Sequence, residues 1–359
     1  MSRLKIGIIG TGGISHAHMR GYNGNTDLAE VVAVADIDAD VAKKAADEWG
    51  VSKHFSDYRK ILDMPEIDAV SVCTYNTAHR EPTVAALDAG KHVLCEKPMA
   101  ASLQDAAAMT AATQRSGKIL MIAFHSRFRA DQLAAKRVVE SGFMGRVYYG
   151  EVTTCRRRGA GGGTFQKSDT AGAGTVVDIG VYQLDTALDI LGHPKPVRVS
   201  ATTELVICPD PSSKVEGMSQ YAGWDPDVID VEEFGAAWIR FEGGLCLVFK
   251  SSWAIHGNSM GRPFFLGEKG GLSLSPLEAH TDMFGSMVDI TPTGLQGPED
   301  GFVAEIKAFL EAVHDGKPSP IPPEQVIQTN VIMDGLYRSV AEEQEVAVAP
   351  WQDAVAAVG

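Results

Sequence analysis

Hydrophobic positions in the first third of the chain form short runs, separated by longer segments with the period of an α-helix. The runs are rich in valine and isoleucine and are largely apolar at successive positions, at residues 4–9, 31–35, 69–73, 92–95 and 119–124. Alanine-rich segments between them predict helices at residues 40–49, 81–89 and 102–115. Such runs are typical of parallel strands buried on both faces. We therefore predict an α/β fold in which residues 1–124 form a doubly wound Rossmann domain with a parallel sheet and right-handed crossovers.

The pattern changes after residue 124. A helical segment at residues 130–140 is followed by strand-like runs with alternating or β-branched residues, at residues 147–154, 197–207, 234–241 and 245–253. Glu242, Gly243 and Gly244 join the last two runs and predict a hairpin. Helical patterns return at residues 175–191, 302–314 and 323–343. Residues 125–359 are therefore expected to form an α+β domain with an open, mostly antiparallel sheet that binds substrate and supports oligomerisation.

The predicted hairpin carries large apolar residues on both faces. Trp238 and Val248 lie in strands that also carry Ile239, Phe241 and Phe249, so both parities are apolar. A strand that is apolar on both faces needs two packing partners. We expect a second subunit's sheet to be one of them, which predicts a homodimer or homotetramer. The alternative is that residues 208–227 or the C-terminal helices cover the second face within one chain.

The net charge and the cysteines limit the expected partners and cellular location of the protein. The 46 acidic and 32 basic residues give a net charge of −14, so neither nucleic acid nor a membrane surface is an expected partner. The five cysteines include no CxxC pair, and the apolar start of the chain is too short for a signal peptide or a membrane span. We therefore expect a cytoplasmic protein. No metal is expected, because His16 and His18 lack further ligands at a suitable spacing.

A glycine-rich turn follows the first predicted strand. It comprises Gly10, Thr11, Gly12, Gly13 and Ile14. Gly10 permits a tight turn, and Gly12 allows the backbone to approach a pyrophosphate at a helix N-terminus. Ser15 replaces the third glycine of the dinucleotide-binding fingerprint. Such a turn can also be a plain strand–helix connection, but the strand before it and the helix after it favour cofactor binding.

Asp36 directly follows the second predicted strand. A carboxylate at this place accepts hydrogen bonds from the ribose hydroxyls and repels a 2′-phosphate. The alternative is that Asp36, together with Asp38, caps the next helix. No basic residue follows until Lys43. NAD is therefore the expected cofactor, and NADP is disfavoured.

Glu96, Lys97 and Pro98 follow the predicted strand at residues 92–95. Parallel α/β sheets bind ligands at the carboxyl ends of their strands, so Lys97 could exchange a proton with a substrate oxygen there. Taken alone, the pattern equally describes a solvated lysine paired with Glu96.

Longer motifs favour the proton-exchange role of Lys97 over a solvated ion pair with Glu96. The glycine-rich turn, the segment Thr74-Tyr75-Asn76-Thr77-Ala78-His79, the segment AGKHVLCEKP at residues 89–98 and the segment AGAGTVVDIGVYQLD at residues 171–185 together resemble the glucose–fructose oxidoreductase/inositol dehydrogenase (Gfo/Idh/MocA) family. The resemblance covers nearly the whole chain and is weakest at residues 159–171.

The resemblance implies roles for individual residues. Lys97 is the implied proton relay and Asp178 its acidic partner, and Tyr182 stands where the family most often has histidine. A spacing of four would place Asp178 and Tyr182 on one helix face. Further cofactor-binding residues implied by the resemblance are Thr74, Tyr75, Asn76, His79, Glu96 and Arg127, and further substrate-binding residues are His125 and Arg157.

Together these features predict an NAD-dependent dehydrogenase or reductase. Hydride would pass between nicotinamide and a secondary alcohol or ketone of a sugar, polyol or cyclitol, with Lys97 moving the hydroxyl proton. One alternative is a glycosidase or epimerase of the same fold that retains its NAD. Another is a sugar or NAD sensor without catalysis, which the intact Glu96-Lys97-Pro98 segment disfavours.

Overall fold

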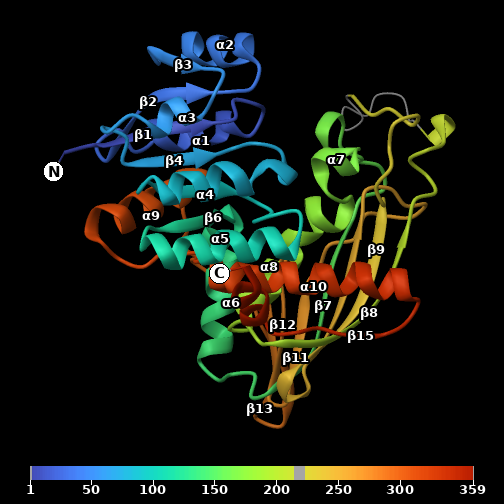
Figure 1. Ribbon diagram of the computed structural model, residues 1–359. Helices are drawn as coiled ribbons and strands as arrows, with labels where there is room; N and C mark the ends of the chain where they lie inside the picture. Colours follow the sequence, from blue (N-terminus) through green and yellow to red (C-terminus); the bar gives the residue numbers. More distant parts are fainter. Residues whose placement is uncertain (1, 214–222, 359) are drawn as a thin grey trace. The chain divides into compact units, whose positions relative to one another are not determined.

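The computed structural model describes residues 2–213 and 223–358 of the 359-residue chain. The chain divides into two compact units (Figure 1). The first contains residues 1–128, 298–327 and 354–359, and the second contains residues 129–297 and 328–353. The first unit thus includes the expected Rossmann segment together with two later segments, residues 298–327 and 354–359.

The first unit is built on a six-stranded parallel sheet of order β3-β2-β1-β4-β5-β6. Its strands are β1 (Leu4–Ile9), β2 (Ala29–Ala35), β3 (Lys53–Phe55), β4 (Ala69–Val72), β5 (His92–Glu96) and β6 (Leu120–Ala123). The helices between them are α1 (Ser15–Asn23), α2 (Ala39–Trp49), α3 (Arg59–Leu62), α4 (Arg80–Asp88) and α5 (Leu103–Ser116). The predicted Rossmann architecture is confirmed.

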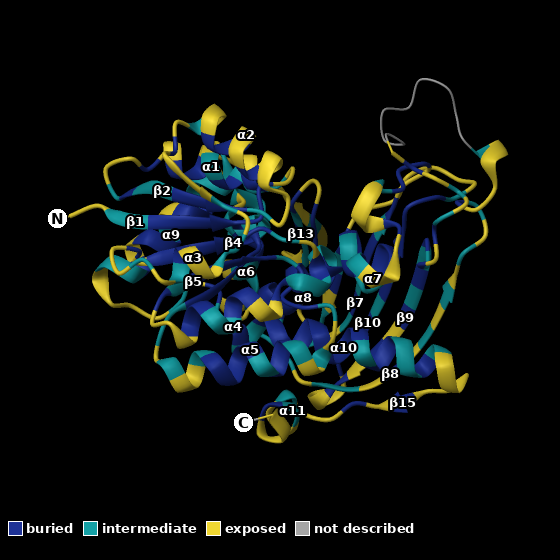
Figure 2. Ribbon diagram, turned by 45° about the horizontal axis from the view of Figure 1, so that its top comes forward, coloured by how far each residue is buried: buried dark blue, intermediate teal, exposed yellow. Residues whose placement is uncertain are grey.

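Burial explains why the central strands are apolar at successive positions. Ile6, Val34, Val70 and Leu94 are all fully buried, and the middle of the sheet is dark blue in Figure 2. Helices cover both faces, so neither strand parity faces water.

Helix α9 (Gly301–Asp315) belongs to the first unit and packs on α1. The two helices approach closely at Gly21, where a Cβ atom would lie 2.4 Å from the Ile306 side chain and 3.0 Å from the Phe302 carbonyl oxygen. Asp300 caps α9 and also accepts a 2.8 Å hydrogen bond from Arg20 on α1. This contact brings residues of α9 beside the Rossmann strands.

The second unit contains a nine-stranded sheet of order β14-β13-β12-β11-β7-β10-β9-β8-β15. Its strands are β7 (Val147–Cys155), β8 (Pro196–Glu204), β9 (Phe234–Phe241), β10 (Cys246–Ser252), β11 (Phe264–Gly267), β12 (Gly270–Ser273), β13 (Glu278–Met283), β14 (Ser286–Ile290) and β15 (Val346–Ala347). Within this second sheet, β7 and β10 are the only described strands that pair in parallel. The expected open, mostly antiparallel sheet is confirmed.

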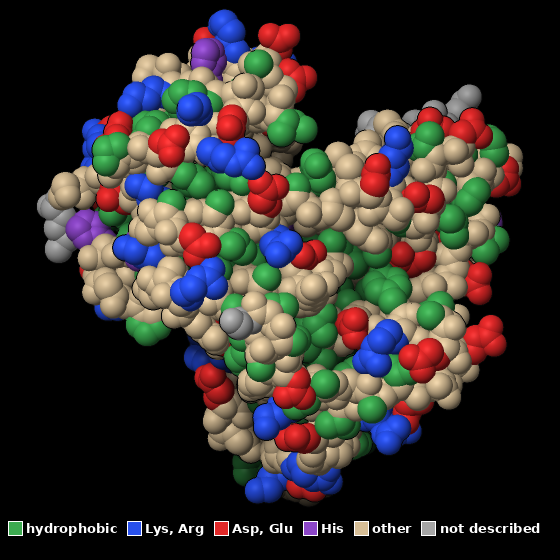
Figure 3. Space-filling view, in the orientation of Figure 1, with side chains coloured by type: hydrophobic (Ala, Val, Ile, Leu, Met, Phe, Trp, Pro, Cys, Tyr) green, Lys and Arg blue, Asp and Glu red, His purple; other side chains and the backbone are tan. Residues whose placement is uncertain are grey.

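The helices of the second unit are α6 (Ala130–Glu140), α7 (Ser168–Ala171), α8 (Val181–Ile190) and most of α10 (Pro323–Glu342). Helix α11 (Trp351–Val358) begins in the second unit and ends in the first. No helix in the described ranges is both long and apolar enough to cross a membrane. Basic and acidic side chains are interspersed over the face seen in Figure 3 and form no basic stripe there.

The β9–β10 hairpin turns at the expected glycines, with φ of 77° at Gly243 and 85° at Gly244. Ile239 and Leu247 are paired and buried on the inner face. On the outer face Trp238 stands opposite Val248 and is 41% exposed. The outer face of the sheet therefore carries apolar side chains that the described part of the chain leaves partly exposed, beside charged residues such as Lys250 and Glu151.

Candidate active site

The glycine-rich turn connects β1 to α1. Gly10 has a φ of 86°, and a Cβ there would lie 2.6 Å from the Cys73 carbonyl oxygen. Gly12 and Gly13 have nothing within 4 Å of an ideal Cβ, so the backbone can be approached closely at the start of α1. The Ser15 hydroxyl donates a 2.5 Å hydrogen bond to the Gly12 carbonyl, which shows how a small residue replaces the third glycine. This turn fits a pyrophosphate bound at a helix N-terminus.

Asp36 lies directly after the carboxyl end of β2. Its Oδ2 accepts hydrogen bonds from the Thr11 backbone nitrogen at 2.8 Å and the Thr11 hydroxyl at 3.1 Å. The cap of α2 is Asp38, whose side chain accepts from Asp40 and Val41. Asp36 is therefore not the capping residue, and it ties the glycine-rich turn to the end of β2. A carboxylate at this place fits ribose hydroxyls and opposes a 2′-phosphate.

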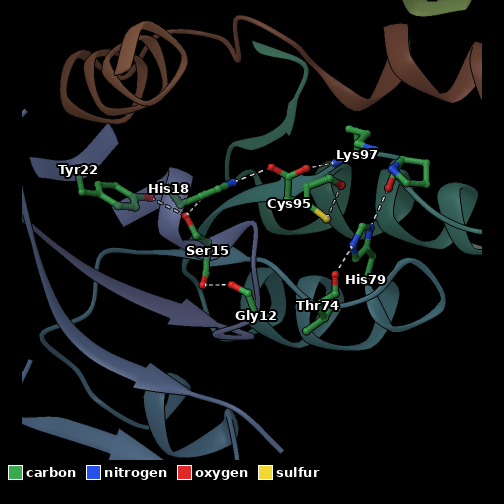
Figure 4. Close-up of polar contacts among 11 residues, drawn as sticks. Gly12, Ser15, His18, Tyr22, Thr74, His79, Cys95 and Lys97 are labelled. Atoms are coloured by element: carbon green, nitrogen blue, oxygen red, sulfur yellow. Dashed lines mark hydrogen bonds and ion pairs between the residues drawn. The ribbon is translucent and has the colours of Figure 1, made fainter. Parts of the chain in front are cut away.

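Glu96 ends β5 and is 4% exposed. Its Oε1 lies 2.8 Å from His18 Nε2, and its Oε2 accepts a 3.0 Å hydrogen bond from the Lys97 backbone nitrogen (Figure 4). Burial by itself raises the pKa of Glu96, but the His18 hydrogen bond and the charges of His18 and Lys97 outweigh it and lower that pKa. An ionised Glu96 thus holds the backbone of the turn that carries Lys97.

His18 extends this contact across the sheet. Its Nδ1 lies 3.1 Å from the Ser71 hydroxyl, which is 2.7 Å from the Tyr22 hydroxyl. His18 and Tyr22 are four residues apart and therefore share one face of α1. The sequence pattern argued against His18 as a metal ligand and did not predict its contact with Glu96. The signal for its real place was that spacing, together with a polar Ser71 inside an apolar strand.

The loop at residues 74–79 lies beside the same turn. His79 is 1% exposed, and its ring nitrogens lie 2.7 Å from the Pro98 carbonyl oxygen and 3.1 Å from the Thr74 carbonyl oxygen. Burial lowers the pKa of His79 despite these two acceptors. His79 therefore joins two loops, while Asn76 is buried and Tyr75 is 38% exposed.

His125 and Arg127 lie in the short helical turn His125–Phe128 after β6. The His125 ring stacks on Phe302 at a centroid distance of 4.3 Å. Arg127 is buried and donates a 2.7 Å hydrogen bond to Gln325. Both residues are thus held by the chain that returns to the first unit, a contact that sequence spacing does not reveal.

Asp178 and Tyr182 belong to the second unit. Asp178 lies in a π-helical turn, Val176–Gly180, which leads directly into α8, where Tyr182 lies. The Asp178 Oδ2 accepts a 3.0 Å hydrogen bond from Trp253 Nε1. The expected regular helix is therefore widened at Asp178, as is frequent at functional sites.

A carboxylate that sequence reasoning missed holds this π-helical turn. Glu232 accepts hydrogen bonds from the Gly174 nitrogen at 2.8 Å, the Val176 nitrogen at 3.1 Å and the Tyr337 hydroxyl at 2.9 Å. A Cβ at Gly174 would lie 1.9 Å from the Glu232 carbonyl oxygen. The partners are far apart in sequence, so no local pattern could reveal this clamp.

The three arginines at residues 156–158 differ in their surroundings. Arg156 and Arg157 are exposed, whereas Arg158 is buried. The Arg158 guanidinium donates to the carbonyl oxygens of Arg157 and Ile255 at 2.7 and 2.9 Å. Arg157 thus keeps an exposed side chain on a strand end fixed by Arg158. Within residues 2–213 and 223–358, no cluster of metal-binding side chains occurs.

The Glu232 clamp predicts a graded loss of stability. Glu232→Gln replaces one acceptor oxygen by a donor that faces backbone N–H groups, so the free energy of unfolding should fall by about 1–3 kcal/mol. Tyr337→Phe removes one donor only and should cost about 0.5–1.5 kcal/mol. Chemical denaturation measures both, and hydrogen exchange at residues 174–178 should rise first. Equal stability of Glu232→Gln and the unmodified protein would contradict the clamp.

Comparisons with known proteins agree with this geometry. Residues 4–124 match the oxidoreductase family with an NAD-binding Rossmann fold, and residues 132–273 match the GFO/IDH/MocA C-terminal domain. The D-glucoside 3-dehydrogenase of Escherichia coli K12 is 32% identical over 343 residues, covering 94% of this chain and 95% of that protein.

The levoglucosan dehydrogenase of Pseudarthrobacter phenanthrenivorans is 29% identical, covering 72% of this chain and 70% of that protein. A solved levoglucosan dehydrogenase structure, in complex with NADH and levoglucosan, superposes with a TM-score of 0.82 at 25% identity, over 97% of this chain and 100% of that one. The glycine-rich turn, Asp36 and the Lys97 turn thus occur in a chain whose two halves both match one family. The chain belongs to the Gfo/Idh/MocA family of NAD-dependent oxidoreductases.

Proposed function

We propose that this protein transfers hydride between NAD and a secondary alcohol or ketone of a sugar, with Lys97 as the proton relay. The observation that carries the proposal is the anchored turn after β5, where a buried carboxylate holds the backbone of Lys97. The sugar class is supported by the names of two relatives, a D-glucoside 3-dehydrogenase and a levoglucosan dehydrogenase.

The cofactor would be held by residues of the first unit. The backbone of Gly10, Gly12 and Gly13 would bind its pyrophosphate, and Asp36 would bind its ribose hydroxyls. The carbonyl oxygens of Thr74 and Pro98 both lie within hydrogen-bond distance of the His79 ring, which supports a role for these loops beside the nicotinamide. When bound, NAD supplies the hydride acceptor or donor.

Lys97 would exchange a proton with the reacting substrate oxygen. In the oxidation direction its neutral amine takes the hydroxyl proton, and in the reduction direction its ammonium returns one. We assign to Asp178 and Tyr182 the orientation of substrate hydroxyl groups, since a carboxylate accepts and a phenol can donate. Arg157 and His125 are further candidates for substrate contact.

The protein is also proposed to be cytoplasmic. All five cysteines are free thiols, four of them buried. A reducing compartment fits a chain whose thiols remain unpaired.

Asp36 should determine cofactor choice. NAD should bind more tightly than NADP, and Asp36→Ala should reduce that preference about tenfold or more, because it removes both the ribose acceptor and the repulsion of the 2′-phosphate. Calorimetric titration with both cofactors measures it. Asp38→Ala is the matched control: it should cost about 1 kcal/mol of stability through the lost cap and leave the preference unchanged. A preference for NADP in the unmodified protein would overturn the assignment.

Lys97→Ala should lower kcat by about 10²–10⁴-fold while NAD affinity stays nearly unchanged, because the side chain moves a proton and its backbone remains anchored by Glu96. Lys97→Arg keeps the positive charge without a usable base and should lose nearly as much. Turnover is followed by reduced-cofactor absorbance with a panel of sugars, and binding by calorimetry. Turnover that survives in Lys97→Ala would place the proton path elsewhere.

We further propose a homodimer or homotetramer that covers the outer face of the nine-stranded sheet. Tyr149, Trp238 and Phe264 form an aromatic group there, with ring centroids 6.0 to 6.3 Å from Tyr149. Such a face is expected to bury a total of about 1,600 Å² or more against a second copy.

Light scattering should therefore give a mass of at least twice 38.3 kDa. Trp238→Glu should weaken the assembly, because it would place a charge in a desolvated contact. Ile37→Glu, at a position that is 84% exposed in the first unit, is the control and should leave the mass unchanged. A monomeric mass for the unmodified protein at micromolar concentration would refute this arrangement.

A further inference from the structure

Helix α9 contains a carboxyl group that the proposed mechanism does not use. Glu305 is 0% exposed, and neither of its carboxyl oxygens has a hydrogen-bond partner among the described residues. Buried carboxylates are normally paired or hydrogen-bonded, because the charged form loses its hydration. An unpartnered, fully buried Glu305 therefore needs a physical explanation.

The neighbours of Glu305 come from three parts of the first unit. It interacts electrostatically with Tyr22 of α1, with Cys73 after β4 and with Glu96 of β5. These groups are neutral or acidic, and His18 on the same face of α1 is hydrogen-bonded to Glu96. Glu305 thus shares a dry region with Glu96, and the hydrogen-bond donors of that region, His18 and the Lys97 nitrogen, contact Glu96.

The two carboxyl groups have opposite surroundings. Glu96 accepts from the Lys97 nitrogen and lies against His18 Nε2. Burial first, and then the charge of Glu96, raise the pKa of Glu305 well above its usual range, while the pKa of Glu96 is lowered. Two carboxylates in one low-dielectric site cannot both ionise easily, so the donors decide which one keeps its proton.

We infer that Glu305 holds a proton while Glu96 carries the negative charge, and that Glu305 is a positioning residue which acts through Glu96 on the turn of Lys97. Its catalytic consequence rests on the proposed role of Lys97. A neutral Glu305 leaves Glu96 as the anionic acceptor for the Lys97 backbone. Ionisation of Glu305 would add a second charge beside Glu96 and favour protonation of Glu96, which would weaken that acceptor.

The proton itself can be observed in the protein without cofactor. A protonated carboxyl group has a carbonyl stretching band that a carboxylate lacks, so infrared spectra at pH 7 should contain a band that Glu305→Gln removes. Glu311→Gln is the matched control, because Glu311 lies on the same helix with a side chain that is 53% exposed. It should leave that band unchanged. A spectrum in which Glu305→Gln removes no protonated-carboxyl band would overturn the inference.

The coupling between the two groups has its own test. Glu96→Gln removes the neighbouring charge, so the Glu305 band should disappear at a pH about one unit or more lower than in the unmodified protein. An unchanged titration would show that Glu96 does not act on Glu305. Because both spectra are recorded without substrate, they stand even if Lys97→Ala remains active.

Stability should depend on pH in a defined direction. A carboxyl group whose pKa is raised in the folded state binds its proton more tightly there, so stability declines as the pH rises from the ordinary glutamate range toward the raised value. Glu305→Gln cannot ionise, so its melting temperature relative to the unmodified protein should increase with pH. Glu311→Gln should show a difference independent of pH. A pH-independent difference for Glu305→Gln would contradict a bound proton.

The catalytic consequence is read from pH profiles. Glu305→Gln has the shape and neutrality of the protonated acid, so its kcat/KM at pH 7 should stay within about threefold of the unmodified value. At alkaline pH it should lack the decline caused by ionisation of Glu305. A uniform loss at every pH would indicate a packing role and overturn the positioning role. In that case an infrared band that Glu305→Gln removes would still show that Glu305 carries a proton, and only its effect on the Lys97 turn would be excluded.

Discussion

The buried charge of Glu96 is the constraint on which the first unit's site depends. A carboxylate that is 4% exposed is costly unless donors surround it. His18 and the Lys97 backbone are those donors, and they come from α1 and from the turn after β5. Removing either would leave a charge in a dry site. The position of the Lys97 turn is therefore set by electrostatic satisfaction as well as by the fold of the loop.

In the second unit, the carboxylate of Glu232 likewise accepts hydrogen bonds from groups far apart in the sequence. That carboxylate satisfies two backbone nitrogens at the start of the π-helical turn and receives the Tyr337 hydroxyl from α10. Gly180 brings the turn close to β10, since a Cβ there would lie 2.6 Å from Phe249. In both units a glutamate that is buried (Glu96) or half-buried (Glu232) fixes the backbone beside a residue proposed to act on the substrate. Rigid backbone at such positions preserves the geometry that proton and hydride transfer require.

The local sequence pattern predicted much of the fold and part of the candidate site. The Gly10 turn and Asp36 could be placed because strand, turn and helix are consecutive in sequence, and the apolar runs revealed the parallel sheet. Strands β11 to β14 were missed because each is only four to six residues long, and all but β11 contain several glycine or polar residues. The partners of Glu96 and Glu232, and the place of Glu305, were missed because each contact joins residues far apart in the chain. Hydrophobic period does not report such pairings.

Hydride transfer by this protein is tested most directly by following the hydrogen at the reacting carbon of the substrate. D-Glucosides and levoglucosan, deuterated at their carbinol carbons, are incubated with the protein and NAD, and the nicotinamide product is analysed by mass spectrometry. Net hydride transfer should place deuterium in NADH released into solution, and replacing Lys97 by alanine should abolish this labelling. Conversion of a labelled sugar without deuterium in free NADH would contradict net hydride transfer and favour an enzyme that retains and recycles its NAD.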